Sequence, residues 1–168
     1  VLSMLEPISL SIPASDGYLL SSLLIQPKCT PRGVVQFHRG TLTPKEFYLP
    51  FCQFLAEQGF VVVSFDYRGM GGSRPKSLKG FDGSLVDWGS KDMAGVLDWI
   101  RQNFPDLPNF VVSHSIGGHL IGLMENCQYL DGVITVASGY GSWRFYSGFN
   151  RWKSAFLWAV YFPFALFS

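Results

Sequence analysis

Charged side chains are scarce in this chain. Asp, Glu, Lys and Arg make up 15% of its 168 residues and leave a net charge of +1, whereas hydrophobic residues make up 48%. A charge balance so close to neutral gives no electrostatic basis for binding nucleic acid or an anionic membrane surface, so we expect neither partner. The hydrophobic content predicts a folded domain with a deep core rather than a disordered chain.

Cysteine is also rare. Cys29, Cys52 and Cys127 form no C-x-x-C pair, and their odd number argues against a disulfide framework. A reducing, cytoplasmic setting is therefore expected. The first residues lack the basic segment followed by an apolar stretch that is typical of a signal peptide. The cysteines and the three histidines lack the spacing of metal ligands, and we therefore expect no bound metal.

Strand-like and helix-like segments alternate along most of the chain. Two strand-like runs flank an Asp16-Gly17 turn, which predicts an antiparallel hairpin. The later strands are short continuous apolar runs, the pattern of strands covered on both faces. Alternation of this kind predicts an α/β fold with a mostly parallel sheet and helices on both faces. The expected strands are 8–12, 18–25, 34–37, 60–65, 110–113 and 132–137, and the expected helices are 44–58, 86–104 and 116–126.

Apolar spacing also predicts which helix faces are buried. In the first helix we expect the inward residues to be Phe47, Phe51, Phe54 and Leu55, and in the second Met93, Val96, Leu97 and Ile100. Asp92 and Asp98 lie on the second helix, where we interpret them as solvated surface charges.

The most informative stretch is Phe110-Val111-Val112-Ser113-His114-Ser115-Ile116-Gly117-Gly118-His119-Leu120. Its pattern predicts a strand, a sharp turn and a helix, with Ser115 at the turn. A serine at such a corner exposes its hydroxyl beside the following backbone N–H groups and the positive end of the helix dipole. This arrangement suits nucleophilic catalysis, although a turn of small residues without a function is the alternative interpretation.

The stretch resembles the G-x-S-x-G nucleophile elbow of the α/β-hydrolase family, except that Ser113 stands where the family normally has glycine. Two more motifs occur in the order of the family, His38-Arg39-Gly40 after the third strand and Asp66-Tyr67-Arg68-Gly69 after the fourth. Together with Asp87-Trp88-Gly89, they are most similar to uncharacterised bacterial-type α/β hydrolases. Asp66 usually fixes the turn of that loop through backbone hydrogen bonds.

The resemblance extends from the N-terminus to about Tyr140. It implies an α/β-hydrolase core over residues 1–141, incomplete at the C-terminus, followed over 142–168 by the aromatic-rich start of a helical cap. The apolar run that begins at Ala155 is too short to span a bilayer. An aromatic cap implies a small acyl substrate of apolar character.

The family pattern also implies roles at the site. Ser115 would be the nucleophile, and the backbone N–H of Ile116 the first oxyanion donor. The second donor would come from the loop after the third strand, where Gly40 and Thr41 are the first candidates and Arg39 is a further one. Ser113 would crowd the turn slightly without preventing it.

The general base and the acid are harder to place. In the family both follow late strands, and residues 140–168 contain no Asp, Glu or His, so we expect both beyond Ser168 and regard the chain as the N-terminal portion of a longer protein. Among the histidines present, His38 is the first candidate for a base, ahead of His114 and His119. Packing is the better explanation for all three, and we expect His119 between its helix and the sheet.

The resemblance therefore implies a serine hydrolase, esterase-like or lipase-like, that acts on carboxylic esters or related acyl compounds. No cofactor is expected: Gly69 to Ser73 is similar to a dinucleotide-binding motif, but Arg74 occupies the place of its third glycine. A non-catalytic binding or interaction module that uses the aromatic C-terminal segment is the alternative. Peroxidase or transferase chemistry on the same elbow also fits the sequence, which leaves the oligomeric state open.

Overall fold

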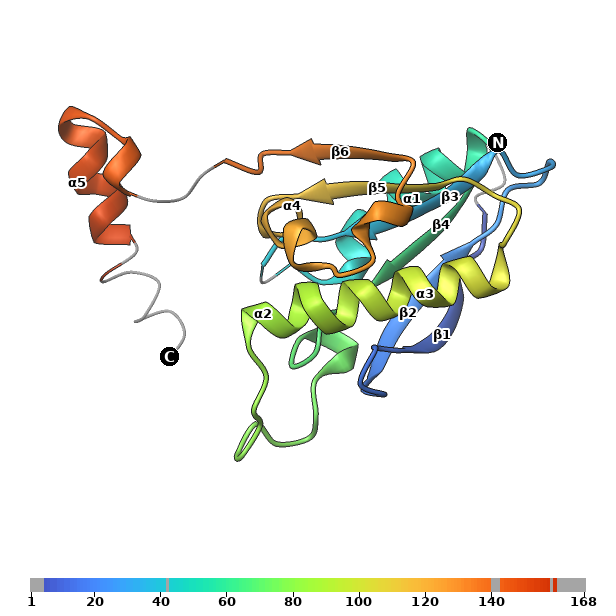
Figure 1. Cartoon of the computed structure of the whole chain (residues 1–168), viewed down its shortest axis with the longest axis horizontal. Helices are drawn as coiled ribbons and strands as arrows, with labels where there is room; N and C mark the ends of the chain where they lie inside the picture. The colour runs from blue at the N-terminus through green and yellow to red at the C-terminus, as the bar shows by residue number, and fades with distance from the viewer. Residues whose placement is uncertain (1–4, 42, 140–142, 158, 160–168) are drawn as a thin grey trace. The chain divides into compact units, whose positions relative to one another are not determined.

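The chain divides into two compact units, with the division between Ser138 and Gly139. A computed structural model describes residues 5–41, 43–139, 143–157 and 159 (Figure 1). We describe the two units separately, beginning with the larger.

The larger unit is built on a six-stranded sheet in the order β1-β2-β4-β3-β5-β6 (Figure 1). β1 and β2 form the expected antiparallel hairpin, and β2 is antiparallel to β4. The other neighbours are parallel, so the predicted mostly parallel α/β sheet is confirmed. The strands are β1 Ile8–Pro13, β2 Leu19–Ile25, β3 Gly33–His38, β4 Phe60–Phe65, β5 Asn109–His114 and β6 Gly132–Val136.

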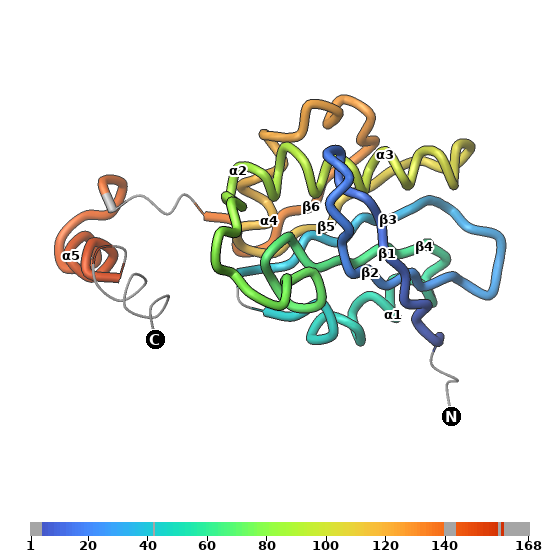
Figure 2. The backbone as a smooth tube through the Cα atoms, turned by 90° about the horizontal axis from the view of Figure 1, so that it is seen from below, coloured from blue at the N-terminus to red at the C-terminus, as the bar shows by residue number. Residues whose placement is uncertain are grey.

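Helices cover both faces of the sheet (Figure 2). α1 (Leu49–Glu57), which follows a 3-10 turn over Lys45–Tyr48, lies on one face. On the other face α2 (Leu85–Asp87) continues through a π turn, Trp88–Met93, into α3 (Ala94–Asn103). The predicted inward residues of this second helix are all buried, namely Met93, Val96, Leu97 and Ile100.

The buried face of α1 differs from the prediction. Phe47, Phe51 and Phe54 are exposed, whereas Cys52 and Ala56 are fully buried. Their small side chains allow the helix to approach β4 and β2, with which it is in contact, and leave the larger aromatic rings on the outer side. Leu55 packs against the buried cluster as expected.

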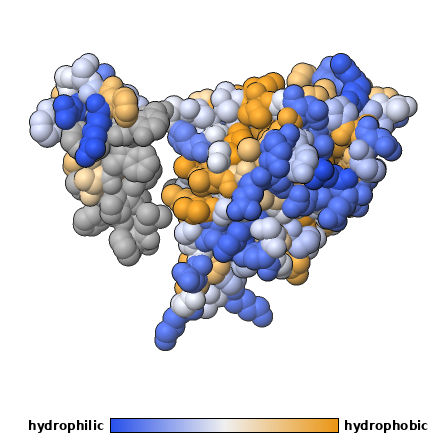
Figure 3. Space-filling view, in the orientation of Figure 1, coloured by the Kyte–Doolittle hydropathy of each residue, from blue (hydrophilic) through white to orange (hydrophobic). Residues whose placement is uncertain are grey.

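β6 is an edge strand rather than a buried one. Val133, Ile134 and Val136 are 46%, 62% and 51% exposed. In the described part of the chain its ladder partner is β5, and no further strand lies beside it. The apolar composition that predicted burial on both faces therefore stands at the surface, and Figure 3 shows apolar residues interrupting the hydrophilic surface of the larger unit.

The helix after the elbow is shorter than expected. α4 spans Ile116–His119, a 3-10 turn continues it over Leu120–Leu123, and Met124 is extended with ψ 115°. The expected helix to Asn126 does not form. Gly117, Gly118 and Gly122 lie in this segment, and each glycine lowers helix stability by about 1 kcal/mol relative to alanine.

The smaller unit contains a 3-10 turn over Trp143–Phe145 and the helix α5, Gly148–Phe156. Phe149, Trp152 and Phe156 are exposed on α5. Whether residues 142–168 begin a cap stays a prediction, and most of the apolar run from Ala155 lies outside the described residues. None of the helices described has the length and apolar character needed to cross a membrane.

Candidate active site

Ser115 occupies a strained corner between β5 and α4. Its φ of 52° and ψ of −120° are rare for a residue with a side chain, and such outliers are typical of functional sites. Two hydrogen bonds hold the backbone there: the Ser115 N–H donates to the carbonyl of Val136 at 2.9 Å, and the Ser138 hydroxyl donates to the carbonyl of Ser115 at 2.9 Å. The residue is half-buried, so part of it is open to solvent.

Gly117 brings the turn at Ser115 against the loop after β3. A Cβ at this position would lie 2.7 Å from the carbonyl oxygen of His38 and 3.0 Å from that of Arg39. Gly118 has no room either, because a Cβ there would lie 2.2 Å from the Ser138 Oγ. The two segments that the sequence assigned to the oxyanion hole are therefore neighbours.

We expect Gly117→Ala to lower the free energy of unfolding by about 1–3 kcal/mol, since the added methyl group meets backbone that has to shift. Gly122→Ala is the matched control, because a Cβ at Gly122 meets nothing within 4 Å. In Gly122→Ala the free energy of unfolding should be unchanged or raised by up to about 1 kcal/mol. Urea unfolding of both variants checks the difference, and equal stabilities would contradict the close approach of the loop.

The oxyanion candidates have different environments. Gly40 is buried, and its N–H donates to the Tyr48 hydroxyl at 3.1 Å. Thr41 follows it at an exposed position of the same loop. The N–H of Ile116, the first candidate, lies at the start of α4.

Ser113 is fully buried where the family normally has glycine. Its hydroxyl donates to the carbonyl of Ile134 on β6 at 3.3 Å. The departure from the family motif therefore adds a side-chain link between β5 and β6 close to the turn.

A buried charge cluster, which the sequence analysis missed, holds the loop after β3. Asp66 is fully buried between Arg39, whose Nε lies 3.2 Å from Oδ1, and Lys45, whose Nζ lies 2.9 Å from Oδ2. It also accepts backbone N–H groups from Lys45 and Gly72, so the expected role of Asp66 in fixing its turn is confirmed.

Arg39 contributes to this cluster from inside the loop. Its guanidinium lies over the Tyr67 ring, 5.2 Å from the centroid, and donates to the carbonyl of Thr43. Burial lowers the pKa of Arg39, an effect that Asp66 opposes. Burial alone would also lower the pKa of Lys45, but the carboxylates of Glu46 and Asp66 outweigh it and raise that pKa.

The parallel register contains the signal that could have revealed the cluster. Phe37 pairs with Ser64 across β3 and β4, so two residues later Arg39 comes beside Asp66. Opposite charges at matching ends of adjacent parallel strands predict an ion pair at that edge of the sheet.

Asp92 is buried rather than solvated, which corrects the sequence interpretation. The π turn places it under the loop after β4, where it accepts the backbone N–H of Arg68 at 2.8 Å and its Nε at 2.7 Å. Arg68 also donates two hydrogen bonds to Asp16, at 2.8 and 2.9 Å. Burial raises the pKa of Asp92 to about 6, although the Arg68 donors oppose the shift. Asp98 is half-buried and accepts a hydrogen bond from Asn126 at 2.8 Å.

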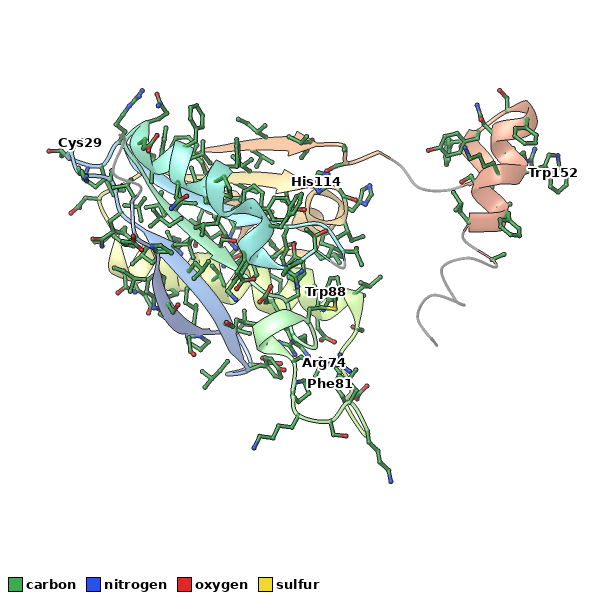
Figure 4. The ribbon with its side chains drawn as sticks, turned by 180° about the vertical axis from the view of Figure 1, so that it is seen from behind. Cys29, Arg74, Phe81, Trp88, His114 and Trp152 are labelled. Atoms are coloured by element: carbon green, nitrogen blue, oxygen red, sulfur yellow. The ribbon has the colours of Figure 1, made fainter. Side chains whose placement is uncertain are left out.

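The histidines occupy three different environments. His38 is fully buried against Phe65, and neither ring nitrogen has a hydrogen-bond partner among the described residues. Burial lowers the pKa of His38 to about 3. The backbone of Gly117 lies nearby and opposes this shift, but it forms no hydrogen bond with the ring. These properties favour packing over proton transfer. His114 is half-buried at the end of β5 (Figure 4), and His119 is exposed rather than packed against the sheet, because α4 turns that side outward.

The burial of neutral His38 predicts acid sensitivity. Its pKa falls from 6.5 in the unfolded chain to about 3 in the fold, so below about 6.5 the unfolded chain binds the proton and stability is lost as the pH falls. The expected loss is about 1.4 kcal/mol per pH unit, or about 2 kcal/mol between pH 7 and pH 5. In His38→Asn this part of the slope should disappear from urea unfolding curves. Parallel slopes for the two proteins would mean that His38 is protonated in the fold.

A shallow apolar hollow lies beside the turn, on the α1 side of the sheet. Its volume is about 200 Å³, and its lining consists of Phe37, Tyr48, Phe51, Val112, Ser113, His114 and Val136. Among the described residues, no three His, Cys, Asp or Glu side chains are grouped so that they could hold a metal ion.

The sequence of residues 29–164 matches the profile of the family described as serine aminopeptidase, S33. The chain belongs to this α/β-hydrolase family. The motif order, the strained serine and the sheet topology of this α/β hydrolase agree with the assignment. No curated protein matches the chain in sequence.

Solved structures share the fold. A thermostable carboxyl esterase from Bacillus coagulans superposes with a TM-score of 0.67 at 24% identity, over 81% of this chain and 46% of the esterase. A soluble variant of monoglyceride lipase from Saccharomyces cerevisiae superposes with a TM-score of 0.66 at 19% identity, over 80% of this chain and 45% of the lipase. An α/β serine hydrolase without a lid from Xanthomonas campestris superposes with a TM-score of 0.63 at 17% identity, over 77% of this chain and 60% of that hydrolase. This α/β hydrolase chain thus spans about half the length of the esterase and the lipase.

Proposed function

We propose that the protein is a serine hydrolase that cleaves carboxylic esters or related acyl compounds, with Ser115 as its nucleophile. The observation that carries the proposal is the φ of 52° at Ser115. This conformation is energetically costly, and hydrogen bonds to the N–H and the carbonyl of the same residue maintain it. The family and the likeness to esterase and lipase folds support it.

The chemistry follows from the geometry of the turn. The Ser115 Oγ attacks the carbonyl carbon of the substrate while a general base takes its proton. The Ile116 N–H stabilises the oxyanion of the tetrahedral intermediate. Thr41 is the candidate for the second donor, because the Gly40 N–H already donates to the Tyr48 hydroxyl. Collapse of the intermediate breaks the ester bond, and the protonated base gives its proton to the leaving oxygen so that the alcohol departs. The same base then takes a proton from water, which hydrolyses the acyl-serine and releases the carboxylic acid while Ser115 regains its proton. The apolar hollow beside the turn supports an acyl substrate of apolar character.

The base and the acid are proposed to come from residues beyond Ser168. His38 is a poor base because burial lowers its pKa to about 3, and residues 140–168 contain no acid or histidine. We also propose a cytoplasmic setting, which is supported by three free cysteines, two of them exposed.

The test is covalent labelling. The chain extended past Ser168 is treated with a fluorophosphonate, and the modified residue is located by intact-mass analysis and peptide mapping. Such a probe reacts with a serine that is exposed on its turn and activated by a base, so one adduct on Ser115 is the expected result. An adduct on a different serine, or no adduct on a chain extended past Ser168, would overturn the proposal.

An interaction module is the second candidate. It is favoured by the exposed aromatic side chains of the smaller unit, with Phe145, Phe149 and Trp152 at 75%, 82% and 74% exposure. Large exposed apolar patches mark interaction surfaces. The absence of labelling on the extended chain would support this candidate.

A further inference from the structure

The hydroxyl of Tyr48 joins two segments of the candidate site. Tyr48 ends the 3-10 turn before α1, and its side chain is buried. Its Oη lies 3.1 Å from the backbone nitrogen of Gly40 and 2.9 Å from Nδ1 of His114. Gly40 belongs to the loop after β3, and His114 immediately precedes Ser115.

The direction of these two hydrogen bonds follows from their chemistry. The backbone N–H of Gly40 can only donate, so the Tyr48 oxygen accepts from it. The hydroxyl proton of Tyr48 is then available to Nδ1 of His114, which accepts when the ring proton is on Nε2. The three groups form a chain, Gly40 N–H to Tyr48 O–H to His114 Nδ1.

The space around Gly40 supports the same arrangement. A Cβ at this position would lie 2.8 Å from Nδ1 of His114 and 3.1 Å from the Tyr48 oxygen, so a side chain there would push the hydrogen-bonded groups apart. On the other side of the loop, the carbonyl groups of His38 and Arg39 adjoin Gly117. The loop is thus fixed from both sides, by α4 at Gly117 and by the Tyr48 hydroxyl at Gly40.

We propose that Tyr48 is a positioning residue, which sets the separation between the nucleophile turn and the oxyanion loop through this hydrogen-bonded chain. The inference rests on the proposed function, because the separation matters for catalysis only if Ser115 and this loop act on one substrate carbonyl. A misplaced donor costs turnover rather than substrate binding.

Packing is the competing explanation for Tyr48. Its ring lies against Phe37, with 4.8 Å between the centroids, and against His114, with 5.9 Å. Tyr48→Phe keeps these ring contacts and removes only the hydroxyl. If Tyr48 serves only in packing, Tyr48→Phe should leave activity unchanged. If it is a positioning residue, Tyr48→Phe should lower activity.

The first measurement needs no catalytic activity. In the wild-type protein we expect ¹⁵N NMR to show His114 with its proton on Nε2 and the Gly40 amide protected from hydrogen exchange. In Tyr48→Phe the Gly40 amide should exchange at least about 10-fold faster, because its acceptor is gone. Tyr129→Phe, at an exposed ring, is the matched control and should leave Gly40 unchanged. Unchanged exchange in Tyr48→Phe, or a proton on Nδ1 in the wild type, would overturn the inference.

The second measurement is the rate of fluorophosphonate labelling at Ser115, followed by kcat and KM for an ester. Tyr48→Phe should slow labelling and lower kcat by about 10-fold with KM nearly unchanged, while Tyr129→Phe behaves as the wild type. Equal labelling rates for Tyr48→Phe and the wild type would overturn the positioning role. If the wild-type chain extended past Ser168 is not labelled at all, the proposed function fails, and the exchange measurement alone decides whether the chain of hydrogen bonds exists.

Discussion

Replacing Ser115 with alanine is expected to abolish fluorophosphonate labelling and to lower ester turnover by about 10⁶-fold, the loss typical of removing a serine nucleophile. The methyl group leaves nothing to attack the carbonyl carbon. The fold should persist, because the hydrogen bonds to Val136 and Ser138 are made by the backbone of residue 115. Ester hydrolysis and the urea unfolding midpoint are the two measurements.

Ser115→Gly adds a control that an alanine cannot give. Glycine adopts a φ of 52° without strain, so this variant should be equally inactive but more stable than the wild type by about 1 kcal/mol. Retained hydrolysis in either variant would reject Ser115 as the nucleophile. A Ser115→Gly protein no more stable than Ser115→Ala would show that the turn is relaxed in solution.

Asp66→Ala is expected to lower the free energy of unfolding by about 3–5 kcal/mol, the cost of breaking a buried ion pair by removing one partner. The carboxylate lies between Arg39 and Lys45, both of which are nearly inaccessible to solvent. Without it, two buried cations lose their anion, and the N–H of Gly72 loses its acceptor. Urea or thermal unfolding gives the magnitude.

Asp106→Ala provides the matched comparison, since Asp106 is an exposed aspartate on a loop of the same unit. Its substitution should change stability by less than about 0.5 kcal/mol. A loss of under 1 kcal/mol in Asp66→Ala would indicate that Arg39 and Lys45 find other anions or reach water in the variant.

Local patterns were sufficient to predict the strands and the sharp turn at Ser115. β-branched runs such as Val61-Val62-Val63 specify a strand wherever they lie in a sheet. At the elbow, small residues around Ser115 leave few alternatives to a tight corner. Both signals reside in neighbouring residues, which is why the sheet and the site of the serine could be predicted from sequence.

The predictions that were wrong concern contacts between segments that are far apart in the sequence. The apolar residues of α1 suggested a buried face, yet the distance to the sheet selected Cys52 and Ala56 instead. Asp92 looked like a surface charge because its partner, Arg68, lies 24 residues away. The exposure of β6 depends on what lies beside the strand, and no pattern within the strand contains that information.

The bond from the Ser115 N–H to the carbonyl of Val136 has a kinetic consequence. Among the described residues β6 has a neighbouring strand on one side only, and strands so placed open locally more often than the centre of a sheet. Each opening at Val136 removes one of the restraints on the φ of Ser115, so the strained conformation of this residue is coupled to the local opening of β6. A strand that paired with β6 on its other side would hold Val136 in the sheet and would thereby keep the backbone of Ser115 in its strained conformation.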